Sequence, residues 1–95
     1  MRLELSAFVE GDLDRIAAHI AEDNPRRAVT FVCDIRMKLA VARDPLIYQL
    51  RPDIGEDARL ASVGRYAILF RVAGDVVRVE RVVWGGRDLP VTLAP

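Results

Sequence analysis

The sequence is poor in the residues that build metal and redox sites. Among its 95 residues, Cys33 is the one cysteine and His19 the one histidine. A single cysteine forms no internal disulfide, and zinc sites of the usual kinds need several cysteine or histidine ligands. We therefore expect no metal site and no cofactor.

Long hydrophobic runs are also missing. No stretch approaches the roughly 20 apolar residues that a membrane-spanning helix needs, and residues 1–5 lack the basic segment and apolar run of a secretory signal. About half of the residues (52%) are apolar, which is enough for one buried core. We expect a single domain over residues 1–95, located in the cytoplasm and without contact to a membrane.

Net charge is absent as well, because 14 Lys and Arg residues balance 14 Asp and Glu residues. Zero net charge argues against direct binding of nucleic acid. The charge is unevenly distributed, with 8 basic against 11 acidic residues in positions 1–58 and 6 against 3 in positions 59–95. Every cation except Lys38 is an arginine, whose planar fork suits carboxylate or phosphate. A GC-rich genome produces the same bias, so both explanations stay open.

The N-terminal half predicts a strand followed by two helices. Residues 2–5 alternate polar and apolar, as in a half-buried strand, and Ser6 offers an N-cap hydroxyl. Apolar residues then recur at helical spacing up to about residue 22, and acidic residues lie near the positive end of this helix. These residues are Leu13, Ile16, Ala17 and Ile20, and Glu10, Asp12 and Asp14 respectively.

A second helix is predicted from Asn24-Pro25, with Asn24 as the capping side chain, to Asp44-Pro45. The short connection between the helices favours an antiparallel helical hairpin. Opposite the main apolar arc of the second helix lies another apolar stripe, formed by Cys33, Met37, Ala40 and Val41. Either the first helix covers this stripe or a partner protein does.

The remainder predicts a loop and three strands. Residues 45–57 suit a loop pinned by apolar side chains, namely Leu46, Ile47, Tyr48, Leu50 and Ile54. Strands are expected at residues 59–63, 66–72 and 76–84, with a tight turn at residues 73–75. The predicted class is α+β: an N-terminal strand and an antiparallel helical hairpin packed on one face of a small, twisted, mainly antiparallel sheet.

Several ordered motifs together resemble one family over about residues 3–89. They are Asp12-Leu13, Ile16, Ile20-Ala21-Glu22-Asp23-Asn24-Pro25, Ala28, Arg51-Pro52, Arg59-Leu60, Val63-Gly64-Arg65-Tyr66, Phe70-Arg71-Val72 and Arg81-Val82-Val83-Trp84-Gly85-Gly86-Arg87-Asp88-Leu89. In this order they resemble ParE-like toxins of the RelE/ParE toxin-antitoxin superfamily.

The resemblance implies a bacterial plasmid- or chromosome-borne toxin that forms a hetero-oligomer with a small antitoxin usually encoded beside it. ParE-like members are associated with inhibition of DNA gyrase, whereas RelE-like members cut messenger RNA on the ribosome. A third possibility is an antitoxin-binding module that is no longer toxic. The fold alone does not decide among these three functions, so the choice has to rest on the residues of the chain.

The ribonuclease alternative lacks an evident acid and base. RNA cleavage needs a base, an acid and cations that stabilise the phosphorus transition state. RNA-cutting relatives generally carry Tyr or His near the C-terminal end, and the tail after Arg87 has neither. We interpret Glu80 as a partner in a cross-strand ion pair, and His19 as a solvated surface residue far along the chain from the basic strands. We therefore predict no catalytic residue and no enzyme activity.

The remaining alternative is a binding surface for the target or the antitoxin. Its candidate residues are Arg59, Arg65, Arg71, Arg81, Trp84 and Arg87. Trp and Arg are common interface hot spots, and Gly85-Gly86 permits close approach of a partner. A structural interpretation, in which Trp84 fills the core and the glycines turn the chain, is equally open. If Tyr66, Ile68, Phe70 and Val72 face the helices, the opposite face is half apolar and half basic and suits an acidic amphipathic antitoxin.

Overall fold

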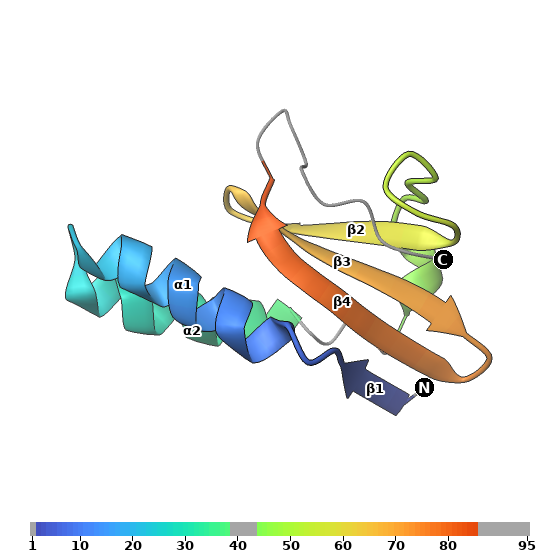
Figure 1. Cartoon of the computed structure of the whole chain (residues 1–95), viewed down its shortest axis with the longest axis horizontal. Coiled ribbons are helices and arrows are strands. Elements are labelled where there is room, and N and C mark those ends of the chain that lie inside the picture. The colour runs from blue at the N-terminus through green and yellow to red at the C-terminus, as the bar shows by residue number, and fades with distance from the viewer. Residues whose placement is uncertain (1, 39–43, 86–95) are drawn as a thin grey trace.

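A computed structural model describes residues 2–38 and 44–85 and confirms the predicted α+β class (Figure 1). The chain runs through β1 (Arg2–Leu5), α1 (Val9–Ala21), α2 (Pro25–Lys38), a 3-10 turn η2 (Pro45–Ile47), β2 (Ala58–Val63), β3 (Tyr66–Ala73) and β4 (Val76–Trp84). The order and bounds of the predicted strands are confirmed to within about one residue. The C-terminal part of the second predicted helix lies outside the described residues.

The four strands form one sheet in the order β1-β4-β3-β2. β1 pairs in parallel with β4, and the other two pairings are antiparallel. Gly74 has a positive φ of 61° and makes the tight turn between β3 and β4. The outer edge of β2 is covered by the preceding loop, since the Arg51 N–H donates to the Ala58 carbonyl at 2.7 Å.

The helix termini agree with the sequence at one position and differ at another. The Asn24 side chain accepts the Arg27 N–H at 3.1 Å, so the predicted cap of α2 is confirmed. The expected N-cap role of Ser6 is wrong, because α1 begins later, after Phe8. Ser6 Oγ instead accepts the Phe8 N–H at 3.2 Å and donates to the Glu80 carbonyl of β4. Ser6 therefore ties the turn before α1 to the sheet.

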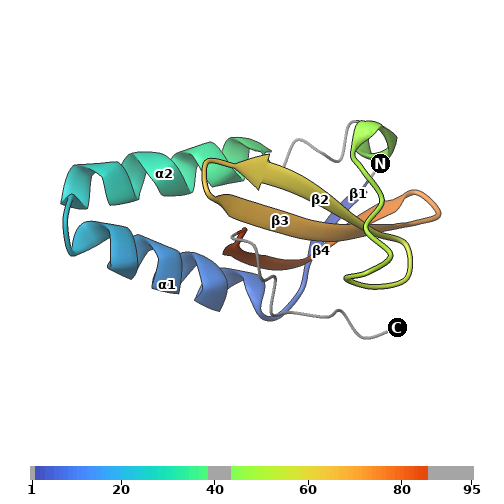
Figure 2. The ribbon, with the colours of Figure 1, turned by 90° about the horizontal axis from the view of Figure 1, so that it is seen from above.

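The helical hairpin packs on one face of the sheet through its base, and its tip projects beyond the strands (Figures 1 and 2). The main core joins apolar side chains of both helices to those of the sheet, namely Val9, Leu13, Ile16, Phe31, Ile35, Ala61, Ile68, Phe70, Val77, Val79 and Val82. Tyr66 and Val72 pack against this cluster, which confirms that the even-numbered residues of β3 face the helices.

The opposite face of the sheet is not the open surface that the sequence suggested. Ala67 and Leu69 are buried there in a second cluster with Ile54 and Ala58, because the loop before β2 folds back over this face. The expectation that Leu46, Ile47 and Leu50 pin that loop is wrong, since all three are exposed. Tyr48 and Ile54 anchor it, Tyr48 through an edge contact with Phe70 at 5.8 Å between ring centroids.

Candidate functional site

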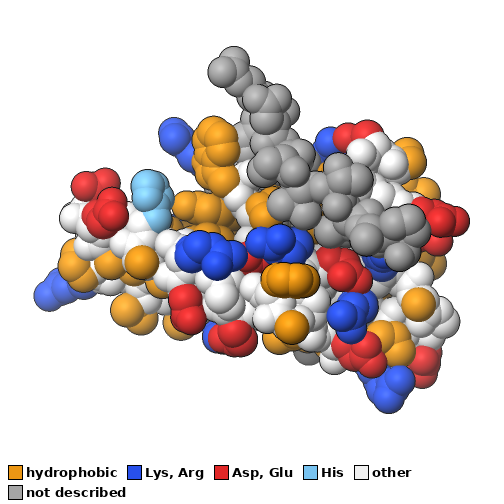
Figure 3. Space-filling model, viewed as in Figure 1, with side chains coloured by type: hydrophobic (Ala, Val, Ile, Leu, Met, Phe, Trp, Pro, Cys, Tyr) orange, Lys and Arg blue, Asp and Glu red, His pale blue; other side chains and the backbone are white. Residues whose placement is uncertain are grey.

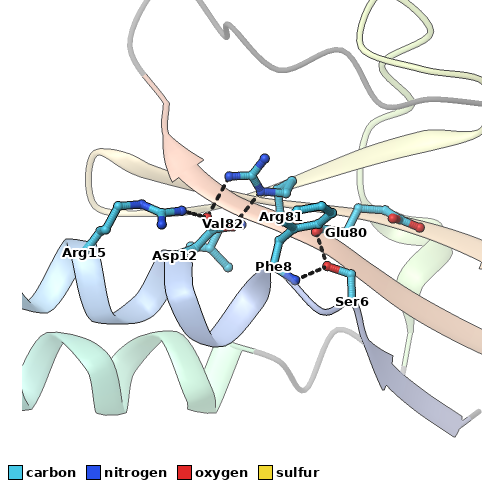
Figure 4. Close-up of polar contacts among 7 residues, drawn as sticks. All are labelled: Ser6, Phe8, Asp12, Arg15, Glu80, Arg81 and Val82. Carbon is cyan, nitrogen blue, oxygen red and sulfur yellow. Dashed lines mark hydrogen bonds and ion pairs between the residues drawn. The ribbon is translucent and has the colours of Figure 1, made fainter.

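The base of α1 is joined to β4 by a buried carboxylate. Asp12 is 2% exposed and accepts two hydrogen bonds from the Arg81 guanidinium, at 2.8 and 2.7 Å, and one from the Val82 N–H at 3.0 Å. Arg15 contacts the same carboxylate from the next turn of α1 (Figure 4). Because β1 pairs with β4 only up to Val79, Asp12 supplies the acceptor that Val82 would otherwise lack at this strand edge.

This arrangement keeps Asp12 ionised. Burial is the largest single influence and raises the pKa of the carboxyl, but the hydrogen bonds from Arg81 and the Val82 N–H, together with nearby positive charge, outweigh burial and lower that pKa below its ordinary 3.8. The positive charges of Arg81 and Arg15 act in the same direction. Asp12 lies three residues after Val9 and four before Ile16, on the buried face of α1. An acidic residue at the spacing of the buried apolar residues of a helix indicates that its carboxylate has a buried binding partner. This signal was not used for Asp12 in the prediction from the sequence.

Arg81 reaches Asp12 because β4 is bulged. Leu69 pairs with Arg81 and Phe70 with Val79, so Glu80 is an extra residue in β4. The bulge shifts the alternation, so that Val79 and Val82 both join the helix-side core. The Arg81 guanidinium also lies 5.0 Å from the centroid of the Phe8 ring. The predicted cross-strand pair of Glu80 is wrong, since Glu80 pairs with Arg78 on its own strand at 3.0 Å.

Beside this junction lies a pocket of about 540 Å³, here called the α1–β4 pocket. It is lined by side chains from α1, the β2–β3 turn and β4, among them Asp12, Arg15, His19, Arg65, Tyr66, Arg81 and Trp84. Figure 3 shows basic side chains gathered over α1, with the histidine to one side and hydrophobic side chains close by. The fold thus brings together three of the six predicted binding residues, Arg65, Arg81 and Trp84.

Trp84 is 56% exposed, so the interpretation that it fills the core is wrong. Gly85 has an intramolecular reason to be glycine: an added Cβ would lie 3.2 Å from the Arg65 carbonyl oxygen and 3.4 Å from the Ala67 Cβ. The Gly85 N–H donates to that carbonyl at 2.7 Å. This contact holds the end of β4 against the β2–β3 turn and so places Trp84 next to Arg65. Gly86 and Arg87 lie outside the described residues.

Arg59 and Arg71 lie away from the α1–β4 pocket. Arg59 donates to the Tyr48 carbonyl at 2.6 Å and so holds the loop before β2. In Arg71 the Nε and Nη2 atoms are buried and have no hydrogen-bond partner within the described part of the chain. In Arg81 and Arg51 the same Nε and Nη2 edge binds a carboxylate. Arg81 binds Asp12 in this way, and Arg51 binds Asp53 at 2.9 and 2.8 Å.

The predicted second stripe is exposed where the structure describes it. Met37 is 76% exposed and Cys33 is also exposed, so the interpretation that the first helix covers them is wrong; Ala40 and Val41 lie outside the described residues. Cys33 lines an apolar groove between the helices, here called the hairpin groove, of about 530 Å³. Other residues of this groove include Ala17, Ala21, Ala28, Val29 and Val32.

His19 is a surface residue, as predicted, with 76% of its side chain exposed and Glu22 at 4.0 Å. Although His19 lies far along the chain from the basic strands, the fold brings it to the α1–β4 pocket with Arg65 and Arg81. Within residues 2–38 and 44–85, no three His, Cys, Asp or Glu side chains lie close enough to hold a metal ion. No helix in the same ranges is long and apolar enough to cross a membrane.

Comparisons with known proteins agree with this fold. A family model described as "ParE toxin of type II toxin-antitoxin system, parDE" matches residues 3–89. A solved structure from the chromosomal ParDE TA system from P. aeruginosa superposes with a TM-score of 0.75 and 23% sequence identity, covering 88% of this chain and 95% of that chain. Curated proteins give no match.

Proposed function

Because the chain belongs to the ParE toxin family of type II toxin-antitoxin systems, we propose that it inhibits bacterial DNA gyrase by direct binding and is neutralised by a ParD-like antitoxin. The observation that carries the first part is the exposed Trp84 beside Arg65 and Arg81 in the α1–β4 pocket. Trp and Arg are, with Tyr, the residues enriched among interface hot spots, and Trp84 exposes more than half of its large side chain beside Arg65. Arg87 follows Trp84 closely in the sequence and belongs to the same proposed surface.

The test of gyrase inhibition is a DNA supercoiling assay with purified gyrase and the purified chain. Trp84→Ala should raise the concentration needed for inhibition at least about tenfold, as hot-spot truncation does. The matched control is Leu46→Ala, which truncates an apolar side chain of similar fractional exposure in η2. Equal inhibition by the wild type and Trp84→Ala would place the gyrase contact elsewhere, and no inhibition by the wild type would refute gyrase as the target.

Cleavage of messenger RNA is a second candidate function, favoured by the position of His19 in the α1–β4 pocket with Arg65 and Arg81. A histidine can move protons and the arginines can stabilise a phosphorus transition state. Pulse labelling just after induction without antitoxin separates the two candidates. Early loss of DNA synthesis supports gyrase inhibition, immediate loss of protein synthesis supports RNA cleavage, and loss of neither supports a module that only binds the antitoxin.

The antitoxin contact that we propose centres on Arg71. Its Nε and Nη2 atoms form the edge that binds carboxylates in Arg51 and Arg81. Because these atoms are buried, an Asp or Glu of the antitoxin would displace the groups that cover this edge and pair with it. Arg71→Lys keeps the charge but loses the bidentate fork and should weaken antitoxin binding in calorimetry about tenfold. Arg78→Lys is the control, because Arg78 is exposed and paired with Glu4 and Glu80. Equal affinity of both variants would argue against Arg71.

A further inference from the structure

We propose that the α1–β4 pocket binds one nucleotide of a single-stranded nucleic acid, with the phosphate held by Arg15 and Arg65 and the base stacked on Trp84. The zero net charge of the chain argued against such binding. Folding creates a locally basic site, because residues as far apart in sequence as Asp12 and Trp84 come together in one small pocket.

The first argument is the charge that remains available in the α1–β4 pocket. Among the residues that the structure describes, its lining contains three arginines and one acidic side chain, Asp12. Asp12 is buried and already accepts hydrogen bonds from Arg81, Val82 and Arg15. Arg81 is therefore neutralised, whereas Arg15 and Arg65 are exposed and leave a surplus of positive charge. This surplus favours an anionic ligand.

The second argument is the hydrogen-bonding character of the pocket. Arginine and the tryptophan indole donate hydrogen bonds and accept none. The carboxylate of Asp12, the strongest acceptor in the lining, is already occupied. A phosphodiester fits such a donor-rich site because its free oxygens only accept. An acidic peptide also brings backbone N–H groups, and the described lining offers few free acceptors for them, namely the Tyr66 hydroxyl and the His19 ring.

The third argument is the exposed indole at the end of the pocket. Trp84 is 56% exposed, and the Gly85 contact with the Arg65 carbonyl fixes the end of β4 that carries it. An aromatic surface beside cationic groups is how proteins hold unpaired bases without reading their sequence. The pocket volume of about 540 Å³ lies within the range of small-ligand sites, which suits a single nucleotide.

The inference rests on the proposed function only in one respect, namely the role that nucleotide binding would have in the cell. Gyrase acts on DNA, so a toxin that holds a nucleotide would bind the enzyme together with its DNA. The binding itself needs no gyrase and is tested without it.

Trp84 is the one tryptophan of the chain, so its fluorescence reports directly on this pocket. The experiment titrates the full-length chain with an eight-nucleotide oligothymidylate, an eight-nucleotide oligouridylate and a polyglutamate peptide. We expect saturable quenching by the oligonucleotides, and the affinity should weaken with salt at a slope of about 0.7 in log Kd against log salt, the value for one neutralised phosphate on a single strand. Arg65→Met should weaken binding at least about tenfold.

Arg78→Met is the matched control, because it removes the same charge from an exposed site six residues before Trp84, roughly 20 Å along the strand. Preference for either oligonucleotide, or equal binding of both, supports the proposal and identifies the source of the phosphodiester. Absence of saturable quenching, an unchanged Kd in Arg65→Met, or competition by polyglutamate at similar concentration would overturn it. Quenching without inhibition of supercoiling would refute the gyrase proposal and leave this one standing.

Discussion

The inner and outer faces of the helical hairpin both carry apolar side chains, but the two faces meet different surroundings. On the inner face Val9, Leu13 and Ile35 pack against the sheet, and Asp12 binds β4. On the outer face Met37 and Val29 are exposed. The comparison teaches that stability resides on the inner face, while the outer face is available for a partner.

Removal of the Asp12 carboxylate should give the largest loss of the stability that the inner face provides. Asp12→Ala leaves the Arg81 guanidinium and the Val82 N–H without their acceptor, and should lower the free energy of unfolding by roughly 3 kcal/mol. Urea denaturation followed by circular dichroism measures the effect. Asp14→Ala, on the exposed side of the same helix, is the control and should change stability by no more than about 0.5 kcal/mol. Equal losses in both variants would contradict the structural role of Asp12.

Acid should remove the same interaction without a mutation. Because the folded pKa of Asp12 is lowered, its stabilising contribution is complete above the ordinary value of 3.8 and is lost as pH falls through the lowered one. The wild type should therefore lose its stability advantage over Asp12→Asn below about pH 4. Thermal unfolding of both proteins between pH 7 and 2.5 tests this, and a constant difference across that range would refute it.

Ser6 should matter less, because it carries one neutral link between the start of α1 and β4. Ser6→Ala removes both the acceptor of the Phe8 N–H and the donor to the Glu80 carbonyl, at a cost of roughly 1 kcal/mol. The control Ser62→Ala changes an exposed serine of β2. If Ser6→Ala destabilises the protein no more than the control does, water replaces the two hydrogen bonds of the Ser6 hydroxyl.

The outer face should give the smallest effect on folding. Met37→Asp is expected to leave the urea midpoint almost unchanged, within about 0.5 kcal/mol, because the side chain is exposed. Ile35→Asp, two residues earlier on α2 and fully buried, should abolish folding. If Met37→Asp keeps the fold but no longer co-purifies with the antitoxin, the outer face is a partner surface; loss of folding would instead place Met37 in the core.

Most of the fold could be predicted from the sequence because its signals are local. The alternation of polar and apolar residues predicted the strands, and apolar residues at helical spacing predicted the helices. Asn24-Pro25 predicted the start of α2. The Asp12–Arg81 pair could not be predicted in this way, since it joins residues far apart in sequence across a strand edge. The bulge at Glu80 is visible only as a break in the alternation of valines between Val79 and Val82.

The candidate site was predicted in part. Arg65, Arg81 and Trp84 were chosen by residue type, and the fold gathers them in one pocket. His19 was set aside because it lies far from these strands in sequence, although α1 brings it to the same pocket. Arg59 was chosen for its charge alone, and its engagement with the Tyr48 carbonyl depends on a loop that has no periodic pattern.

The parallel pairing of β1 with β4 makes the first and last described strands neighbours. During translation β1 and α1 emerge first, yet the sheet edge and the partner of Asp12 exist only after Arg81 and Val82 have been synthesised. Contacts of such long sequence separation also slow folding. A nascent chain therefore remains without its finished α1–β4 pocket until β4 has been synthesised and can pair with the segments that emerged first.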